Sequence, residues 1–173
     1  MRSFGILGLA LAVSCAIPAL ADEQLIPLAQ SGSWAAVEHR PSMTDPPDVC
    51  LASVINGAMA LRSDGTTVEL RSGNDSWSLP DGVQGSISFT VNGNTYSFDI
   101  VSNTDTMVSA DVDADKVQPI LDDMAKASSL TLTIGKAKPI SVSLSGSSKA
   151  LNAFRTCAGI GRGAAGGGTN PFQ

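Results

Sequence analysis

The carboxylates of the segment DVDADKVQPILD, from Asp111 to Asp122, have the spacing closest to a known kind of site. Counted from Asp111, acidic residues occupy positions 1, 3, 5 and 12, which are ligand positions in an EF-hand calcium loop. Position 6, which needs glycine for a sharp turn, is Lys116, and position 12 is aspartate instead of glutamate. The same residues fit a strand end followed by a helix cap. We predict that structure and no metal site.

Side chains suited to catalysis are sparse elsewhere in the sequence. His39 is the only histidine, and the pattern supplies no partners for a triad or a zinc site, so we expect it on the surface. The segment GRGAAGGG (residues 161–168) follows a predicted helix and lacks the Gly-Lys-Ser/Thr ending of a phosphate loop. No pair of carboxylates is spaced for acid–base chemistry. The sequence therefore predicts a protein that is not an enzyme and needs no cofactor.

The first residues are typical of a secretory signal peptide. A positively charged start, the short apolar run FGILGLALAV and small residues at Ala19 and Ala21 predict a signal peptide over residues 1–21, cleaved after Ala21. An alternative is a lipoprotein signal in which Cys15 carries the lipid. Either interpretation places the protein in the periplasm or outside the cell.

Composition limits the classes of partner. The chain of 173 residues carries a net charge of −5 and has no cluster of lysine and arginine, which argues against nucleic-acid binding. After the signal segment, no apolar run approaches the roughly 20 residues of a membrane span. We expect one domain over residues 22–160 and a flexible glycine-rich tail over residues 161–173.

Two cysteines remain after the predicted cleavage, Cys50 and Cys157. An even number of cysteines in an exported protein predicts one disulfide, which would tie an early strand to the last helix. The alternative is a pair of free buried thiols. A catalytic thiol is not indicated, because the sequence has no Cys-x-x-Cys motif.

Alternation of apolar and polar residues predicts most of the structure. In SISFTVNGNTYSFDI (residues 86–100), Asn92-Gly93 suits a type I′ turn that pairs Val91 with Asn94 and Phe89 with Tyr96. A second two-residue turn is predicted at Asp64-Gly65, pairing Leu61 with Val68. Further strands are expected over residues 34–39, 49–55, 107–112, 129–134 and 140–144. The fold predicted is a mainly β protein, a single antiparallel β-sandwich of seven to nine strands with two short α-helices.

The two helices are predicted from caps and apolar stripes. In the first, Asp115 is the expected cap, Pro119 falls in the first turn, and the apolar stripe consists of Val117, Ile120, Leu121 and Met124. In the second, Ser147 is the expected cap, the helix ends at Gly159, and the inward residues are Ala150, Leu151, Phe154 and Cys157.

The order of these features resembles the invasion-associated locus B family of small exported proteins of Gram-negative bacteria. The resemblance rests on the strands that carry Trp34 and Cys50, on WSLPDGVQGSISFTVNG (residues 77–93) and on ISVSLSGSSKALNAF (residues 140–154). The family usually has further cysteines in mid-chain, which this sequence lacks. The closing helix is also similar to that of type VI secretion accessory proteins. The resemblance implies a periplasmic or surface-associated β-sandwich with a role at the envelope or in host-cell entry.

These observations predict an exported envelope- or virulence-associated protein that acts by binding another protein. A periplasmic enzyme inhibitor or immunity-type protein and a secreted effector are the alternatives. Strand faces of serine and threonine offer few binding anchors, so we expect a partner to dock on the connections 38–49 and 71–82. Arg40 and Trp77 are the predicted binding residues there. Trp34 and Trp77 would otherwise pack as core, which is the common place for tryptophan in a sandwich.

Overall fold

The computed structural model describes residues 24–161, which form eleven β-strands and two α-helices. The strands are β1 (Gln24–Ser31), β2 (Trp34–Arg40), β3 (Val49–Val54), β4 (Ala60–Ser63), β5 (Val68–Gly73), β6 (Ser86–Val91), β7 (Asn94–Asp99), β8 (Ser102–Asn103), β9 (Met107–Val112), β10 (Ser129–Ile134) and β11 (Ile140–Ser143). The helices are α1 (Ala114–Lys126) and α2 (Ser147–Ala158). The predicted signal peptide with Cys15, and the predicted tail apart from Gly161, lie outside the described residues.

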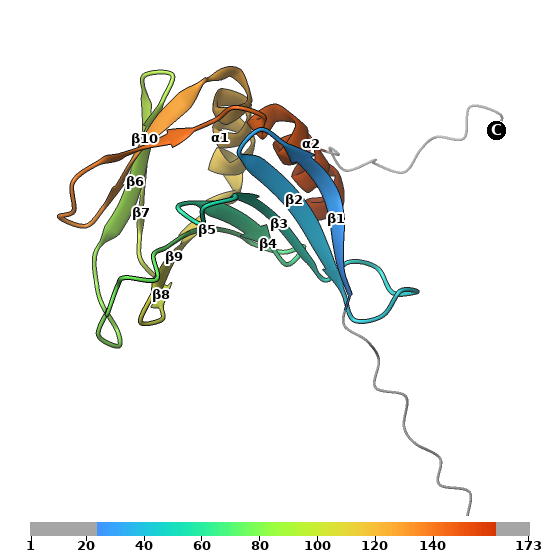
Figure 1. The fold of residues 1–173 in the computed structure, drawn as a ribbon, viewed down its shortest axis with the longest axis horizontal. Coiled ribbons are helices and arrows are strands. Elements are labelled where there is room, and N and C mark those ends of the chain that lie inside the picture. Colours follow the sequence, from blue (N-terminus) through green and yellow to red (C-terminus); the bar gives the residue numbers. More distant parts are fainter. Residues whose placement is uncertain (1–23, 162–173) are drawn as a thin grey trace, which may run out of the picture.

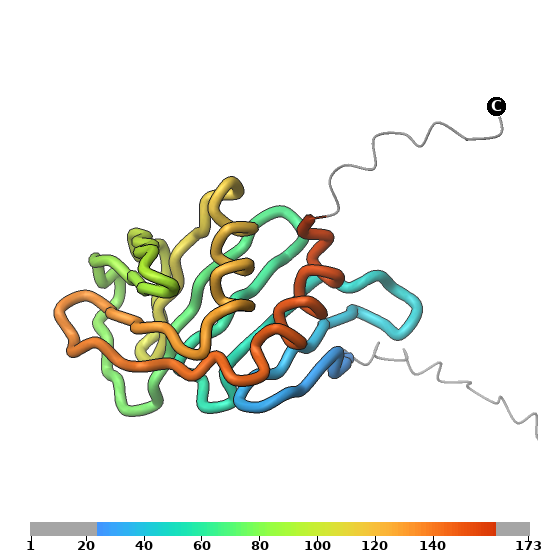
Figure 2. Tube along the Cα trace, turned by 90° about the horizontal axis from the view of Figure 1, so that it is seen from above, coloured from blue at the N-terminus to red at the C-terminus, as the bar shows by residue number. Residues whose placement is uncertain are grey.

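The strands form two antiparallel sheets. The larger has the order β1-β2-β3-β4-β5-β9-β8, and the smaller has the order β11-β10-β6-β7. Both helices and the smaller sheet lie on the same side of the larger sheet, as Figures 1 and 2 show. Helix α2 contacts β1, β2 and β3, and α1 contacts α2. The predicted fold class, mainly β with two antiparallel sheets and two short helices, is confirmed. Within residues 24–161 neither helix is long and apolar enough to cross a membrane.

The number of strands exceeds the seven to nine predicted. Strand β1 was not predicted, because its alternation of inward and outward side chains is interrupted at Leu28. There the register with β2 shifts between Pro27 and Ala29. Such a bulge moves the following side chains to the other face, so a period-two pattern is lost. The two-residue strand β8 is too short for any period to be visible.

The hairpin formed by β6 and β7 has the predicted register. Val91 pairs with Asn94, Phe89 with Tyr96 and Ile87 with Phe98. Asn92 has a φ of 52°, which agrees with a type I′ turn. The rings of Phe89 and Tyr96 lie 5.3 Å apart between centroids, and they form one of the cross-strand pairs that stabilise a sheet.

The hairpin formed by β4 and β5 has a different register from the predicted one. Leu61 pairs with Leu70, and Ser63 pairs with Val68, so the connection has four residues instead of two. Oδ1 of Asp64 accepts the backbone N–H groups of Thr66 and Thr67 at 3.0 and 2.9 Å and thereby stabilises the longer loop. Because the shift is two residues, each side chain stays on its predicted face.

Both helices begin earlier than predicted, and both predicted caps are wrong. Asp113, not Asp115, is the N-cap of α1, and Pro119 therefore lies beyond the first turn. Gly146 is the N-cap of α2, and the hydroxyl of Ser147 instead donates to the Met124 carbonyl at 3.1 Å. The predicted apolar stripe of α1 is confirmed, since it contains the buried residues Val117, Ile120, Leu121 and Met124. In α2 the predicted end at Gly159 is confirmed, and Ala150, Leu151 and Phe154 are buried.

The predicted disulfide is present between Cys50 of β3 and Cys157 of α2, with the two Cα atoms 5.9 Å apart. It joins positions separated by 107 residues and ties the last helix to the larger sheet. In the chain-entropy description, a loop of this length stabilises the folded state by about 4–5 kcal/mol. The disulfide is compatible with an exported protein.

Candidate functional site

Trp77 lies in the connection between β5 and β6 and is held there by backbone hydrogen bonds. Its N–H donates to the carbonyl of Asn74 at 2.9 Å, and the Asn74 N–H donates to the carbonyl of Thr106, also at 2.9 Å. The Asn74 side chain accepts the Ser76 N–H at 2.9 Å, which closes an Asx turn. The tryptophan ring is half-buried and packs against the edge of the core. This connection is therefore an ordered platform that presents one side of an indole ring.

The ring lines a hollow of about 660 Å³, which we call the Trp77 hollow. Its apolar lining includes Trp77, Ile55, Met107, Ile134 and Ile140, and its polar lining includes Asn56, Ser72, Asn74, Asp75 and Thr106. The lining combines ends of the larger sheet with the β10–β11 end of the smaller sheet. Ile55 and Ile140 are 58% and 44% exposed. This is a volume typical of ligand-binding hollows, with apolar side chains facing solvent.

Arg40 lies at the other end of the larger sheet from the Trp77 hollow. Strand β2 runs from Trp34, whose cross-strand partner is Val54 beside Ile55, to Arg40. Nε of Arg40 donates to Oε1 of Glu38 at 2.6 Å, and its Nη1 donates to the Asp45 carbonyl at 3.1 Å. The structure does not bring the two predicted binding residues together. Arg40 thus stabilises the base of the 41–48 connection, and its guanidinium group is hydrogen-bonded both to Glu38 and to Asp45.

Trp34 is a core residue, as expected if it packs inside the sandwich and does not form part of a binding surface. It is fully buried, and its Nε1–H donates to the carbonyl of Ser143 at 2.8 Å. Because Trp34 belongs to the larger sheet and Ser143 to the smaller one, this hydrogen bond joins the two sheets. Trp34 therefore has a structural role in the core.

The segment considered for calcium is a strand end followed by a helix. Asp111 is the next-to-last residue of β9, Asp113 occupies the N-cap position of α1, and Asp122 of α1 faces α2. Asp122 accepts hydrogen bonds from Gln118 at 2.9 Å and Arg155 at 2.6 Å, and these bonds hold the pKa of its carboxyl below the usual range. Among residues 24–161, no three His, Cys, Asp or Glu side chains are grouped to hold a metal ion.

His39 lies beside a carboxylate at the end of β2. Its Nδ1 is 2.6 Å from Oδ1 of Asp48. This hydrogen bond with His39 lowers the pKa of the Asp48 carboxyl. The pair closes the base of the 41–48 connection, where the His39 side chain is half-buried at 24% exposure.

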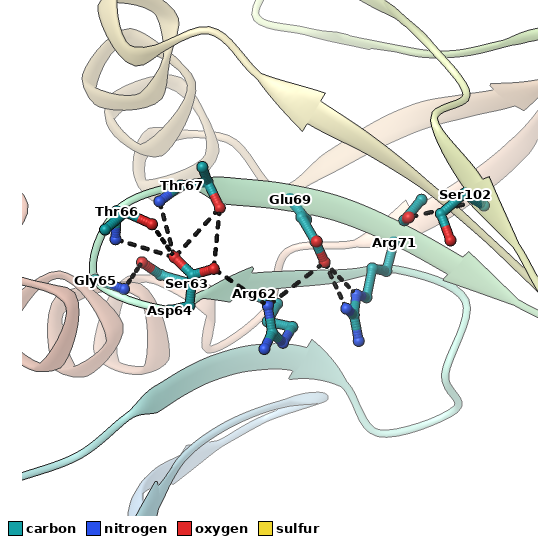
Figure 3. A network of polar contacts seen from close by, with 10 residues as sticks. Arg62, Ser63, Asp64, Gly65, Thr66, Thr67, Glu69, Arg71 and Ser102 are labelled. Atoms are coloured by element: carbon teal, nitrogen blue, oxygen red, sulfur yellow. Dashed lines mark hydrogen bonds and ion pairs between the residues drawn. The ribbon is translucent and has the colours of Figure 1, made fainter.

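The uncovered face of the larger sheet carries a row of charged residues, shown in Figure 3. Glu69 of β5 accepts a hydrogen bond from Arg71 at 2.7 Å and lies 3.8 Å from Arg62 of β4. Arg62 also lies 3.9 Å from Asp64 in the β4–β5 turn. Each arginine has an acidic neighbour, so this row is a mutually neutralised surface network. Each such exposed ion pair contributes little to the free energy of unfolding, about 0–1 kcal/mol.

One feature of the site could not be predicted from any single segment of the sequence. Ile55 and Ile140 are far apart in the sequence and meet only through the contact of the two sheets. Glu38, by contrast, has a detectable signal: it continues the alternation of Trp34 and Ala36 and therefore belongs to the buried face of β2. It is 6% exposed, and its position beside the disulfide was not anticipated.

Comparison with known proteins finds no matching family model, no similar curated protein and no similar solved structure.

Proposed function

We propose that this chain is an exported, non-enzymatic envelope- or virulence-associated protein that binds a protein partner at the Trp77 hollow. The predicted signal peptide and the disulfide support export to the periplasm or beyond it. The resemblance to the invasion-associated locus B family supports a role at the envelope or in host-cell invasion.

One observation carries the proposal: Ile55 and Ile140 are exposed beside the half-buried ring of Trp77 around a single hollow. Scattered exposed apolar residues are ordinary, but apolar residues grouped around a concave site are typical of binding surfaces. Tryptophan is enriched among the residues that dominate binding energy, particularly where surrounding contacts exclude water. An apolar side chain of a partner would remove these three residues from water together.

The backbone around the hollow favours recognition by a preformed surface. The Asn74 turn and the hydrogen bond from the Leu79 N–H to the Asp105 carbonyl, at 2.8 Å, hold both sides of Trp77. A surface that is ordered before binding loses little conformational entropy when a partner docks.

The test uses the processed protein as bait in quantitative capture from envelope extract and from host-cell extract. A partner retained by the wild-type protein is expected to be reduced at least about tenfold by Ile55→Ser combined with Ile140→Ser, because burial of each isoleucine is worth about 1.5–3 kcal/mol. Leu25→Ser is the matched control, since Leu25 is 71% exposed on β1 and does not line the hollow. Equal capture by the double variant and the control variant would remove the hollow from the binding site. Cell fractionation tests export separately.

A further inference from the structure

The two cysteines of the disulfide differ in their exposure to solvent. Cys50 is 4% exposed, whereas Cys157 is half-buried and lines a hollow of about 590 Å³. We call this the Cys157 hollow; it is lined by Leu28, Glu38, Pro47, Asn152, Ala153, Thr156 and Cys157. A molecule that enters between α2 and the 41–48 connection therefore meets Cys157 and not Cys50.

A buried carboxylate shares this hollow with Cys157. Glu38 is 6% exposed and is the direct cross-strand neighbour of Cys50, since the two residues pair between β2 and β3. Its Oε1 accepts a hydrogen bond from Nε of Arg40 at 2.6 Å. Its Oε2 lies 3.8 Å from Sγ of Cys157. Glu38 is thus close to both halves of the disulfide.

The environment of Oε2 depends on the redox state of the cysteines. A disulfide sulfur has no hydrogen to donate, so in the intact disulfide the Cys157 sulfur leaves Oε2 without a donor from that side. A buried carboxylate oxygen without a donor is costly. A thiol at this position would supply an S–H donor. Oε2 of Glu38 is therefore placed to take part in proton transfer at the Cys157 sulfur, 3.8 Å away.

We propose that the Cys50–Cys157 bond is a site of thiol–disulfide exchange with a low-molecular-weight thiol, which attacks Cys157 with Glu38 transferring the proton. The entering thiol RSH gives its proton to Oε2 of Glu38 as its sulfur approaches Sγ of Cys157. An R–S–S bond to Cys157 forms, the bond between Cys157 and Cys50 breaks, and Cys50 leaves as a thiolate. Glu38 then returns the proton to Cys50. The sum is RSH plus protein disulfide giving a mixed disulfide at Cys157 and a thiol at Cys50.

The size of the hollow favours a small thiol. A volume of about 590 Å³ falls within the range of small-molecule sites, about 300–1,000 Å³. Exchange does not require α2 to leave the core, because Leu151 and Phe154 of the same helix are fully buried and would keep it packed. The mixed disulfide thus forms on a folded protein.

The experiment treats the oxidised, processed protein with reduced glutathione, quenches early time points with acid and locates the adduct by peptide mass spectrometry. The adduct is expected on Cys157, at a rate that does not change when urea is added below the unfolding transition. An adduct mainly on Cys50 would overturn the proposal. So would a rate that rises with urea in parallel with global unfolding, because exchange would then need the unfolded chain.

Variants test the role of Glu38. Glu38→Gln keeps an acceptor for Arg40 and is expected to slow the exchange at least about tenfold, below the usual range of general acid–base effects. Glu38→Asp, which retains a carboxylate, is expected to react faster than Glu38→Gln. Glu69→Gln is the matched control, because Glu69 also accepts a hydrogen bond from an arginine two residues further along its strand, on the opposite face. Exchange in Glu38→Gln at the rate of the control would overturn proton transfer by Glu38.

Discussion

Gly32 and Gly146 meet where the β1–β2 turn crosses the connection from β11 to α2. A Cβ atom on Gly146 would lie 1.9 Å from the Ser31 carbonyl oxygen, and one on Gly32 would lie 2.3 Å from the Ser145 carbonyl oxygen. Both glycines have positive φ, 84° and 55°. The close crossing lets the Ser33 N–H donate to the Ser145 carbonyl at 3.1 Å. The β11–α2 connection is thereby fixed against the β1–β2 turn.

This crossing predicts a large effect for Gly146→Ala. The variant is expected to lower the free energy of unfolding by more than about 3 kcal/mol, because left-handed backbone strain of about 1–3 kcal/mol adds to a backbone contact that no side-chain rotation relieves. Urea unfolding measures the change. Gly57→Ala is the control: Gly57 also has positive φ, but nothing lies within 4 Å of its Cβ position, so only about 1–2 kcal/mol is expected. Equal losses in both variants would contradict the role of the crossing.

Trp34 gives a second prediction about the contact of the two sheets. Trp34→Phe keeps most of the apolar volume but removes the Nε1–H donor that binds the Ser143 carbonyl. Loss of the hydrogen bond and part of the packing is expected to cost about 1–3 kcal/mol. Thermal or urea unfolding measures this loss. Hydrogen exchange of the β11 amides should accelerate more than that of the β4 amides, because Ser143 belongs to β11. Uniform acceleration would mean that the bond does not specifically hold β11.

The sequence predicted the β6–β7 hairpin well because its information is local. Asn92 and Gly93 both tolerate the positive φ of the turn, and the side-chain pattern on either side fits only one pairing. The β4–β5 hairpin lacked this agreement. There the Asp64 carboxylate stabilises a longer loop, and a shift of two residues leaves the apolar pattern unchanged. Alternation therefore identified the buried face but not the register.

The sequence pattern predicted only part of the candidate site. Trp77 was predicted as a binding residue because turn residues surround it, and the structure places it on the wall of a hollow. Its neighbours Ile55 and Ile140 come from the ends of two different sheets, and no local pattern brings them together. Arg40 was grouped with Trp77 through loop composition alone, which carries no information about which end of a sheet a loop occupies.

Asp123 should make the stability of the protein depend on pH in the acidic range. Its carboxylate accepts hydrogen bonds from Asn94 and Tyr96, each at 2.8 Å, and these bonds, that of Asn94 first, hold its pKa below the usual value. The unfolded-state pKa is about 3.9, so the contribution is present above about pH 4 and is lost as pH falls through the folded-state pKa. Asp123→Asn should therefore flatten the decline in stability at acid pH, measured by urea unfolding. Asp99→Asn, an exposed change on β7, is the control and should leave the decline as it is in the wild type.

Tyr96 gives a matching prediction at alkaline pH. Burial, followed by the hydrogen bond to Asp123, raises the pKa of Tyr96 to about 12. Because it is the only tyrosine, the ultraviolet absorbance of tyrosinate reports this group alone. The unfolded chain ionises near pH 10, so this contribution to stability is present below about pH 10 and is lost as pH rises through the folded-state pKa. Asp123→Asn should lower the pH at the midpoint of Tyr96 ionisation. A wild-type midpoint near the value of free tyrosine would contradict the contact.

Asp64 allows the register of the β4–β5 hairpin to be tested directly. Hydrogen bonds from the backbone of Thr67 and from the Thr66 side chain and backbone hold the pKa of the Asp64 carboxyl far below its usual range, so the carboxylate stays ionised at neutral and mildly acidic pH. Asp64→Ala removes the acceptor and is expected to speed hydrogen exchange of the Thr66 and Thr67 amides several-fold. Asp64→Asn keeps Oδ1 as an acceptor, so its exchange rates at these two amides should lie between those of the wild type and those of Asp64→Ala. Cross-strand nuclear Overhauser contacts show whether the alanine variant retains the pairing of Leu61 with Leu70. If exchange at both amides is unchanged in Asp64→Ala, the backbone alone sets the four-residue turn, and the carboxylate does not.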